Sequence, residues 1–82
     1  MVKSKEEILT ELQTVARQVF ARPDLTIARE TVADDVAEWD SLSHMQLIMQ
    51  VEKRFGIRLT IVDISGLENV GDLVDAVESK LT

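Results

Sequence analysis

The chain has 82 residues, enough for one domain but too few for a large core together with a deep active-site cleft. Apolar residues make up 45% of the sequence and only Phe20, Trp39 and Phe55 are aromatic, so an ordered domain with an aliphatic core is expected. The net charge of −6 argues against nucleic acids and anionic membrane surfaces as partners. It favours proteins that present basic patches, although charge also serves solubility alone.

The sequence contains no cysteine, which excludes disulfides, thiolate metal sites and a nucleophilic thiol. No metal site is expected, and any thioester chemistry would need a sulfur from another source. No apolar run approaches the ~20 residues of a membrane span, and the first residues do not resemble a signal peptide. The expected compartment is the cytoplasm.

A first helix is predicted over about residues 4–21. Ser4 and Glu7 have the spacing of a capping box, and apolar residues then recur at helical intervals up to Phe20. Pro23 is expected to end this helix, because the residue before a proline is disfavoured in the helical region.

Residues 22–40 show no sustained periodicity and predict a long loop. A helical turn is expected near residues 31–36. The loop should be held by apolar side chains that enter the core, namely Leu25, Ile27, Val32 and Val36.

Asp40 is a good N-cap for a second helix over residues 41–55, and Gly56 a natural C-terminal stop. An extended link and a short helix over residues 61–65 are preferred to a lone strand, which would have no partner. Asn69 should cap a final helix over residues 70–81. The prediction is a single all-α domain, residues 1–82, folded as a small antiparallel four-helix bundle with three longer helices, one short one and a long first loop.

The second helix carries two apolar stripes, where a surface helix normally has one. At about 100° per residue, Leu47, Ile48, Val51 and Phe55 share one face, which should belong to the core. The other stripe consists of Leu42, Met45 and Met49 and flanks Ser41. This stripe is predicted to be an exposed docking surface for partner proteins, unless the long loop covers it.

Acidic residues gather just before Ser41, and Asp34, Asp35 and Glu38 suggest a docking rim for a basic partner. Helix capping explains Asp40, but explains the other three less well. Trp39 is either a side chain that packs into the core or an exposed recognition anchor that joins this docking set.

The segment from Glu38-Trp39-Asp40-Ser41-Leu42 to Phe55-Gly56-Ile57 resembles the acyl and peptidyl carrier protein family. The family's hallmark is Asp-Ser-Leu at the start of the second helix, followed by an apolar helix that ends in Phe-Gly-Ile or Phe-Gly-Val. The resemblance covers the whole chain in layout and about residues 36–62 in motif. Together with the length and the acidic charge, this makes the match specific.

The resemblance implies a carrier rather than an enzyme. Ser41, between Asp40 and Leu42, would carry a covalent 4′-phosphopantetheine arm, whose thiol holds acyl or aminoacyl groups as thioesters. The implied partners are a phosphopantetheinyl transferase, an acyl- or aminoacyl-activating ligase and a downstream synthase or transferase. A monomer is expected.

Departures from the fatty-acid-synthesis pattern indicate a specialised, free-standing carrier. Trp39 precedes the motif, Ser43 replaces an acidic residue, and Gln46 and Lys53 occupy positions that are typically acidic. The expected pathway is of the polyketide, peptide, D-alanyl or polysaccharide type, and general fatty acid synthesis is the alternative. An acyl chain could shelter beside the second helix, in a pocket lined by Ile57, Leu59, Ile61, Val62, Ile64 and Leu67, unless these are simply core residues.

Two other functions compete with the carrier interpretation. Ser41 and His44 lie three residues apart on one helix face and could form a nucleophile pair, which also needs an orienting third group and oxyanion donors. The sequence has one histidine, no Gly-x-Ser-x-Gly motif and little volume for a cleft, which argues against a hydrolase. A non-catalytic helical interaction module would explain the apolar stripe and the charge, but it would leave the Ser41 motif unexplained.

Overall fold

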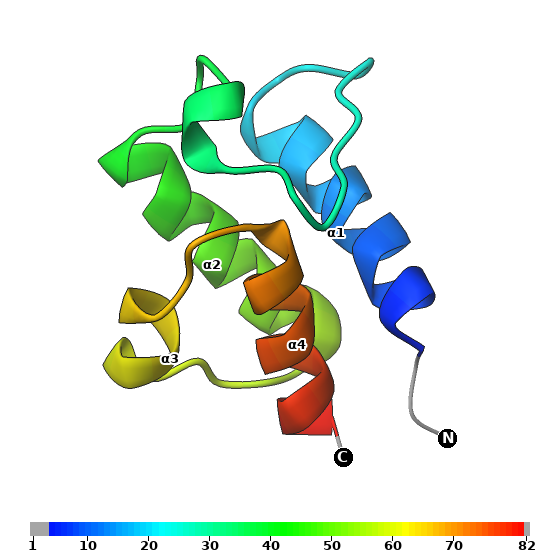
Figure 1. The fold of residues 1–82 in the computed structure, drawn as a ribbon, viewed down its shortest axis with the longest axis vertical. Coiled ribbons are helices and arrows are strands. Elements are labelled where there is room, and N and C mark those ends of the chain that lie inside the picture. Colours follow the sequence, from blue (N-terminus) through cyan, green and yellow to red (C-terminus); the bar gives the residue numbers. More distant parts are fainter. Residues whose placement is uncertain (1–3, 82) are drawn as a thin grey trace.

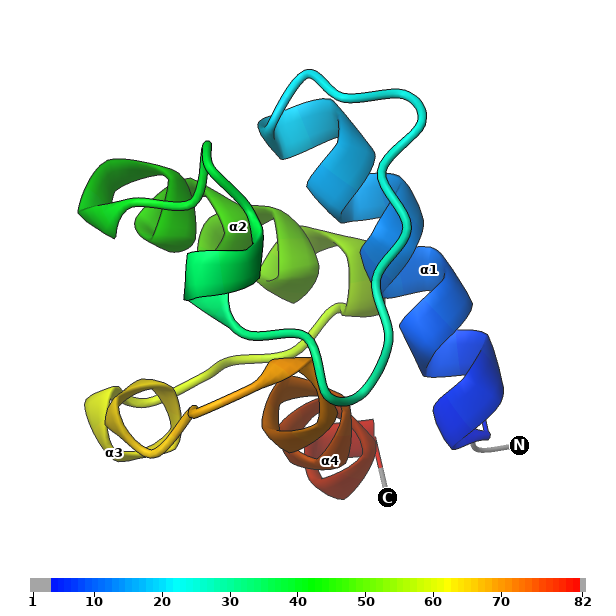
Figure 2. The same ribbon diagram turned by 45° about the horizontal axis from the view of Figure 1, so that its top comes forward.

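The computed structural model describes residues 4–81, and in that range it contains four α-helices and a single turn of 3₁₀-helix (Figure 1). The elements in chain order are α1 (Lys5–Val19), η1 (Ala33–Asp35), α2 (Ser41–Phe55), α3 (Ile61–Ser65) and α4 (Val70–Leu81). Helix α1 packs against both α2 and α4, and α3 is a short helix at the side of the bundle (Figure 2). The all-α fold with three longer helices, one short helix and a long first loop is therefore confirmed.

The core is aliphatic, as the composition predicts. Helix α1 contributes Ile8 and Leu12, and α4 contributes an apolar stripe that is buried at Val70, Leu73, Val74 and Val77. The face of α2 assigned to the core is buried at Leu47, Ile48 and Val51, with Phe55 packed at its edge.

Helix α1 begins as predicted and ends earlier than predicted. Ser4 caps it, and the Ser4 and Glu7 side chains each accept a hydrogen bond from the other residue's backbone N–H at 3.2 Å. The helix ends at Val19 rather than near Ala21, because Ala21 has a left-handed backbone with φ of 54°. The N–H groups of Ala21 and Arg22 donate to the carbonyls of Gln18 and Arg17, which completes a Schellman motif before Pro23 is reached.

The long loop is anchored in the core as predicted. Leu25, Ile27 and Val36 are buried, while Val32 is only partly buried. The predicted helical turn is η1. Two polar side chains of α1 also hold the loop backbone: Arg17 Nε donates to the Leu25 carbonyl at 2.6 Å, and Gln13 Oε1 accepts from the Ile27 N–H at 3.0 Å.

The same loop also caps the start of α4. The N–H groups of Val70 and Gly71 donate to the carbonyls of Thr31 and Arg29 at 2.9 and 2.8 Å. Asn69 Oδ1 accepts from the next N–H, that of Asp72, at 2.8 Å, so Asn69 caps the helix as predicted. The first N–H groups of α4, which have no partner within the helix, are thus satisfied from two directions.

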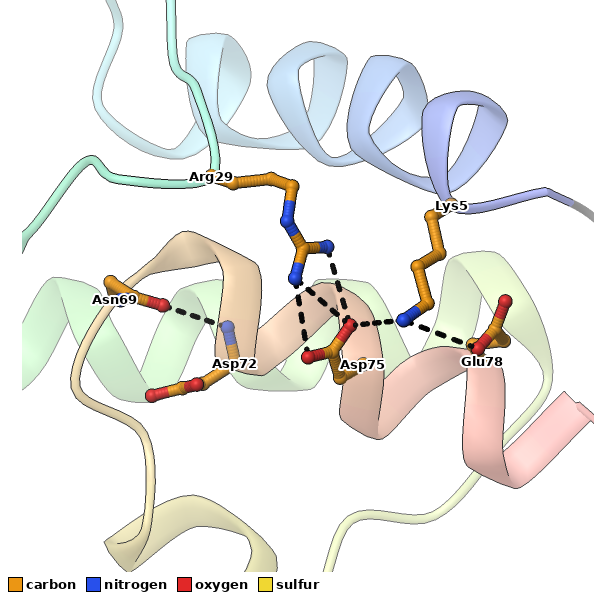
Figure 3. A network of polar contacts seen from close by, with 6 residues as sticks. All are labelled: Lys5, Arg29, Asn69, Asp72, Asp75 and Glu78. Atoms are coloured by element: carbon orange, nitrogen blue, oxygen red, sulfur yellow. Dashed lines mark hydrogen bonds and ion pairs between the residues drawn. The ribbon is translucent and has the colours of Figure 1, made fainter.

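Asp75 joins three distant parts of the chain at the surface (Figure 3). It lies on α4 and pairs with Lys5 of α1 at 3.0 Å and with Arg29 of the loop at 3.2 Å. The hydrogen bond from Arg29 has the largest effect and that from Lys5 the second largest, and both lower the pKa of the Asp75 carboxyl group below its ordinary value.

The link between α2 and α3 is extended and short. Gly56 ends α2 with a left-handed backbone, φ 65°, as predicted. Glu52 Oε2 then accepts a hydrogen bond from the Leu59 N–H at 2.8 Å, and Thr60 caps α3 through the Asp63 N–H at 3.2 Å. The preference for a short helix over a strand at residues 61–65 is confirmed.

Candidate functional site

Ser41 is the first residue of α2 and its side chain is exposed. Asp40 is the N-cap, as predicted, and its carboxylate accepts a hydrogen bond from the Ser43 N–H at 2.9 Å. This hydrogen bond has the largest effect on the pKa of Asp40, which it lowers below its ordinary value together with other bonds to nearby backbone and side-chain groups. The motif therefore holds a primary hydroxyl in solvent at a rigid helix start.

Ser43 fixes the backbone on the other side of Asp40, a role that the sequence analysis missed. Its Oγ accepts a hydrogen bond from the Asp40 N–H at 2.8 Å and donates to the Glu38 carbonyl at 2.8 Å. The Asp-x-x-Ser spacing is the sequence signal for this reciprocal cap. Ser43 thus holds the segment that leads into Ser41.

Trp39 and His44 form a pair beside Ser41. The indole Nε1–H donates to His44 Nδ1 at 3.1 Å, and the two rings stack with centroids 6.1 Å apart. The indole also meets the Phe20 ring, at 5.5 Å between centroids. Trp39 is only partly exposed and packs on the core, so the structure agrees with the packing alternative rather than with an exposed recognition anchor.

The hydrogen bond between Trp39 and His44 has the wrong direction for a nucleophile pair. In a catalytic triad the histidine Nδ1 donates its proton to a carboxylate that orients the ring. Here Nδ1 is an acceptor, so a neutral His44 carries its proton on Nε2 and has no lone pair there to accept one from Ser41. The arrangement therefore does not support hydrolytic chemistry at Ser41.

Two hollows adjoin the motif. An open groove of about 410 Å³ is lined by Ala33, Trp39, Asp40, Ser41 and His44. A smaller cavity of about 60 Å³ shares three of these residues, and its lining is Ala33, Trp39, His44, Leu67, Glu68, Asn69 and Leu73. The groove at Ser41 and the smaller cavity therefore lie next to each other.

The pocket predicted from residues 57–64 is not formed as proposed. Ile61 and Val62 are 84% and 81% exposed, so these two side chains face solvent instead of an acyl chain. Leu59 is buried, and Ile57 and Ile64 pack against the core, which is the alternative considered for them. The physical reason is that Ile61 and Val62, the first two residues of α3, lie on the side of this short helix that faces away from the core, whereas Ile64 packs against it. Of the predicted set, Leu67 does line the cavity beside His44.

The second apolar stripe of α2 is exposed. Leu42, Met45 and Met49 are 70%, 48% and 57% exposed, so the long loop does not cover them. Ile61 and Val62 of α3 add to the exposed apolar surface of the molecule, and the sequence analysis had placed them in the interior. Large apolar side chains in solvent on a small domain are a feature of protein-binding surfaces.

The predicted acidic rim is exposed, but two of its members also have structural roles. Asp35 Oδ2 accepts a hydrogen bond from the Val32 N–H at 3.0 Å and so caps η1. Glu38 pairs with Arg22 at 3.3 Å. Asp34 is exposed on η1. Capping therefore explains Asp35 as well as Asp40, which the sequence analysis had not expected.

Among residues 4–81 the structure shows neither a metal centre nor a membrane-spanning helix. In this range no three histidine or acidic side chains converge as they would around a metal ion. None of the helices formed there is both long and apolar enough to cross a membrane.

Comparison with known proteins identifies the family. Residues 10–77 match the family model described as a phosphopantetheine attachment site. The acyl carrier protein of Acidothermus cellulolyticus is 36% identical over 75 residues, which cover 92% of this chain and 89% of that protein.

Solved structures agree with this match. The solution structure of the holo acyl carrier protein from Geobacter metallireducens has a TM-score of 0.85 and 43% identity, covering 90% of this chain and 85% of its own. The crystal structure of the Thermotoga maritima acyl carrier protein has a TM-score of 0.81 and 25% identity, with coverage of 94% and 89%. The chain therefore belongs to the phosphopantetheine-binding family of acyl carrier proteins.

Proposed function

We propose that Ser41 is the attachment point of the 4′-phosphopantetheine arm and that the bundle delivers acyl groups held on it. The observation that carries this proposal is an exposed serine hydroxyl at the first position of α2, inside the Asp40-Ser41-Leu42 motif. During attachment, Ser41 Oγ would bond to phosphorus while the pyrophosphate linkage of coenzyme A breaks and its nucleotide half leaves. A transferase would supply the base that takes the hydroxyl proton.

The residues around Ser41 fit such a group. A phosphodiester at the N-terminus of α2 is favoured by the helix dipole. The open groove of about 410 Å³ beside Ser41 leaves room for a flexible chain. When bound, the arm supplies the thiol that the cysteine-free chain lacks, and this thiol holds the acyl group as a thioester.

Mass spectrometry tests the attachment. Apo protein incubated with coenzyme A, Mg²⁺ and a promiscuous phosphopantetheinyl transferase should gain the mass of one phosphopantetheine group, and fragmentation should place it on Ser41. Ser41→Ala should gain nothing. The matched control is Ser65→Ala, which removes an exposed serine of α3 and should still be modified. If the wild-type protein gained no mass in this reaction, the proposed carrier role would be refuted.

The docking surface is proposed to be Leu42, Met45 and Met49 on α2, together with the acidic rim of Asp34, Asp35 and Glu38. Their exposure supports the proposal, because a partner protein can reach these side chains. Substitutions at exposed positions should also leave the core intact. Asp34 is the acidic residue best suited to test docking by substitution, because Asp35 caps η1 and Glu38 pairs with Arg22.

Binding to the transferase can be compared in Met45→Glu and in a control, Gln18→Glu, at an exposed position of α1. Met45→Glu should weaken binding at least tenfold, because a charge replaces an apolar contact. Both variants should have the same unfolding temperature as the wild-type protein. Equal affinity of the two variants would remove Met45 from the docking surface.

We further propose a specialised client pathway, of the polyketide, peptide, D-alanyl or polysaccharide type. The support is the set of non-acidic residues around the motif: Trp39, Ser43, Gln46 and Lys53. General fatty acid synthesis remains the second candidate, because the relatives above are named simply acyl carrier proteins. Holo protein tested with a malonyl transferase and a ketosynthase of general fatty acid synthesis separates the two: efficient elongation would favour the general role.

The proposed role needs no catalytic group on this chain, only an activating ligase that loads the arm and a synthase or transferase that unloads it. We propose the cytoplasm as the compartment and a monomer as the working form. Size-exclusion chromatography with light scattering tests the latter. A stable dimer under dilute conditions would overturn it.

A further inference from the structure

The groove at Ser41 lies between η1 and the start of α2 (Figure 1), and its lining has one side-chain donor left to offer. The five lining residues are Ala33, Trp39, Asp40, Ser41 and His44. Alanine has no polar side-chain group, an ionised carboxylate only accepts, and the serine oxygen would be used by the bond to the arm. The indole N–H of Trp39 is already donated to His44 Nδ1 at 3.1 Å. The donor that remains is the imidazole Nε2–H of His44.

Trp39 determines which nitrogen of His44 donates. Because Nδ1 accepts the indole N–H, the proton of a neutral imidazole lies on Nε2. Phe20 holds the indole in turn, with ring centroids 5.5 Å apart, and the backbone N–H of Trp39 donates to the Val36 carbonyl at 3.0 Å. Among residues 4–81 no group accepts a hydrogen bond from His44 Nε2, and the ring is only partly buried. The Nε2–H is therefore available to a ligand.

The imidazole lies on the same side of α2 as Ser41. Residues three apart on a helix are neighbours, with Cβ atoms about 5–6 Å apart. Side chains on a helix also lean toward its N-terminus, so the His44 ring lies over the turn that begins with Ser41. The contact of this ring with Trp39, which precedes Ser41, agrees with that direction. The phosphodiester is bonded directly to the serine oxygen, so it is the part of the arm nearest to the ring.

A phosphodiester at Ser41 benefits from such a donor, because the acidic cap competes with it for the helix start. Asp40 already accepts the Ser43 N–H at 2.9 Å with its carboxylate and the His44 N–H at 2.8 Å with its carbonyl. The carboxylate also places a negative charge next to the phosphodiester, and two negative charges repel each other. A hydrogen bond to a charged acceptor is stronger than one between neutral groups, so a bond from His44 offsets part of this repulsion.

We propose that His44 donates its Nε2–H to a phosphodiester oxygen of the arm on Ser41, and that Trp39 is a positioning residue that holds the ring for this bond. The pair keeps the first group of the arm against the start of α2, while the rest of the arm stays flexible. The inference rests on the proposed attachment at Ser41. The competing acceptor is the carboxylate of Glu68, which lines the small cavity on the other side of His44.

Nuclear magnetic resonance of the single histidine tests the bond. ¹⁵N–¹H spectra of the apo protein and of the protein loaded from coenzyme A are compared at about pH 8, where histidine is ordinarily neutral. An exposed imidazole N–H exchanges rapidly with water, so the Nε2–H signal should be absent from the apo protein and present in the loaded protein. Its absence from the loaded protein would overturn the inference.

Two other outcomes of this comparison are informative. An Nε2–H signal of equal strength in the apo protein would assign the bond to Glu68 and would also refute the inference. If the wild-type protein gained no phosphopantetheine, as judged by its mass, the attachment at Ser41 would have failed instead.

The phosphorus signal of the loaded protein tests the same bond from the side of the acceptor. In the wild-type protein it should shift when the chain is unfolded in urea, and in His44→Leu this shift should fall to less than half. His44→Gln should restore most of the shift, because its amide nitrogen reaches nearly the position of the imidazole Nε2 and keeps a donor there. The matched control is Gln50→Leu, which removes an amide donor from an exposed position further along α2 and should keep the wild-type shift. Equal shifts in the wild-type protein and His44→Leu would contradict the bond.

The positioning role of Trp39 is tested by removing its indole N–H. Trp39→Phe keeps an aromatic ring next to Phe20 and should weaken the Nε2–H signal of the loaded protein by at least half, because the imidazole is no longer held. The matched control is Phe20→Leu, which loosens the packing of the indole but leaves its N–H in place and should retain the signal. Full signal in Trp39→Phe, or equal loss in both variants, would remove this role from the indole N–H. The wild-type comparison decides the bond from His44 by itself if either variant proves too unstable to study.

Discussion

The end of α1 offers a sharp test of the backbone reasoning, because Ala21 occupies a conformation that suits glycine. Ala21 is the one non-glycine residue among residues 4–81 with a positive φ, at 54°. Its side chain is exposed, so its methyl group contributes little packing. The hydrogen bonds of the Schellman motif come from the N–H groups of Ala21 and Arg22, and a glycine would keep both. Ala21→Gly should therefore stabilise the protein.

The magnitude follows from two opposing effects. A left-handed backbone costs an alanine about 1–2 kcal/mol relative to glycine. Glycine loses more conformational freedom on folding, which takes back about 0.4–1 kcal/mol. The free energy of unfolding should therefore rise by about 0.5–1 kcal/mol, equivalent to roughly 2–8 °C in a domain of this size.

Urea unfolding followed by circular dichroism measures this change, with an unaltered dependence on urea as the sign that only stability has changed. The matched control is Ala37→Gly, at an exposed loop residue with a negative φ, which should lose about 0.4–1 kcal/mol. If Ala21→Gly were neutral or destabilising while Ala37→Gly behaved as expected, the assignment of strain to Ala21 would be refuted.

Three further substitutions follow from the structure. Gly71→Ala should lower the free energy of unfolding by about 1 kcal/mol although alanine favours helices, because its Cβ would lie 3.1 Å from the Arg29 carbonyl oxygen. A higher unfolding temperature for this variant would contradict the close approach. Asp75→Asn should cost less than about 1 kcal/mol at neutral pH. Hydrogen bonds from Arg29 and Lys5 lower the pKa of Asp75 in the folded protein, so the stability that this carboxylate contributes is complete above about pH 4 and is lost as the pH falls through its folded pKa. The Asp75→Asn variant should therefore lose less stability on acidification than the wild-type protein, and equal losses would contradict the pairing. Ser43→Ala should cost about 1 kcal/mol and speed amide exchange in the first turn of α2, and unchanged exchange would contradict the reciprocal cap.

The first turns of α2 present two different surfaces. Leu42, Met45 and Met49 point into solvent, where partner proteins can reach them. His44 lies between them in sequence, yet it borders the cavity and is bonded to Trp39. Because these residues share one helix, a partner that docked on the exposed stripe would lie close to His44 and this cavity.

The sequence by itself determined the elements whose causes are local. The capping box of Ser4 and Glu7, the cap at Asp40 and the left-handed stop at Gly56 each depend on residues within one helical turn, and each appears as predicted. The sequence also identified a second apolar stripe on α2 at Leu42, Met45 and Met49, whereas only the structure decided that the long loop leaves it exposed.

Only the tertiary structure decided the features that join distant residues. The carbonyls of Arg29 and Thr31 cap α4 from a loop some forty residues earlier, and no local pattern announces such a bond. The exposure of Ile61 and the place of Leu67 at the cavity depend on how a single helical turn is set against α4, where hydrophobic periodicity carries no information. The position of Trp39 likewise depends on Phe20 and His44, because packing rather than residue type decides whether a tryptophan is exposed to partners or held against the core.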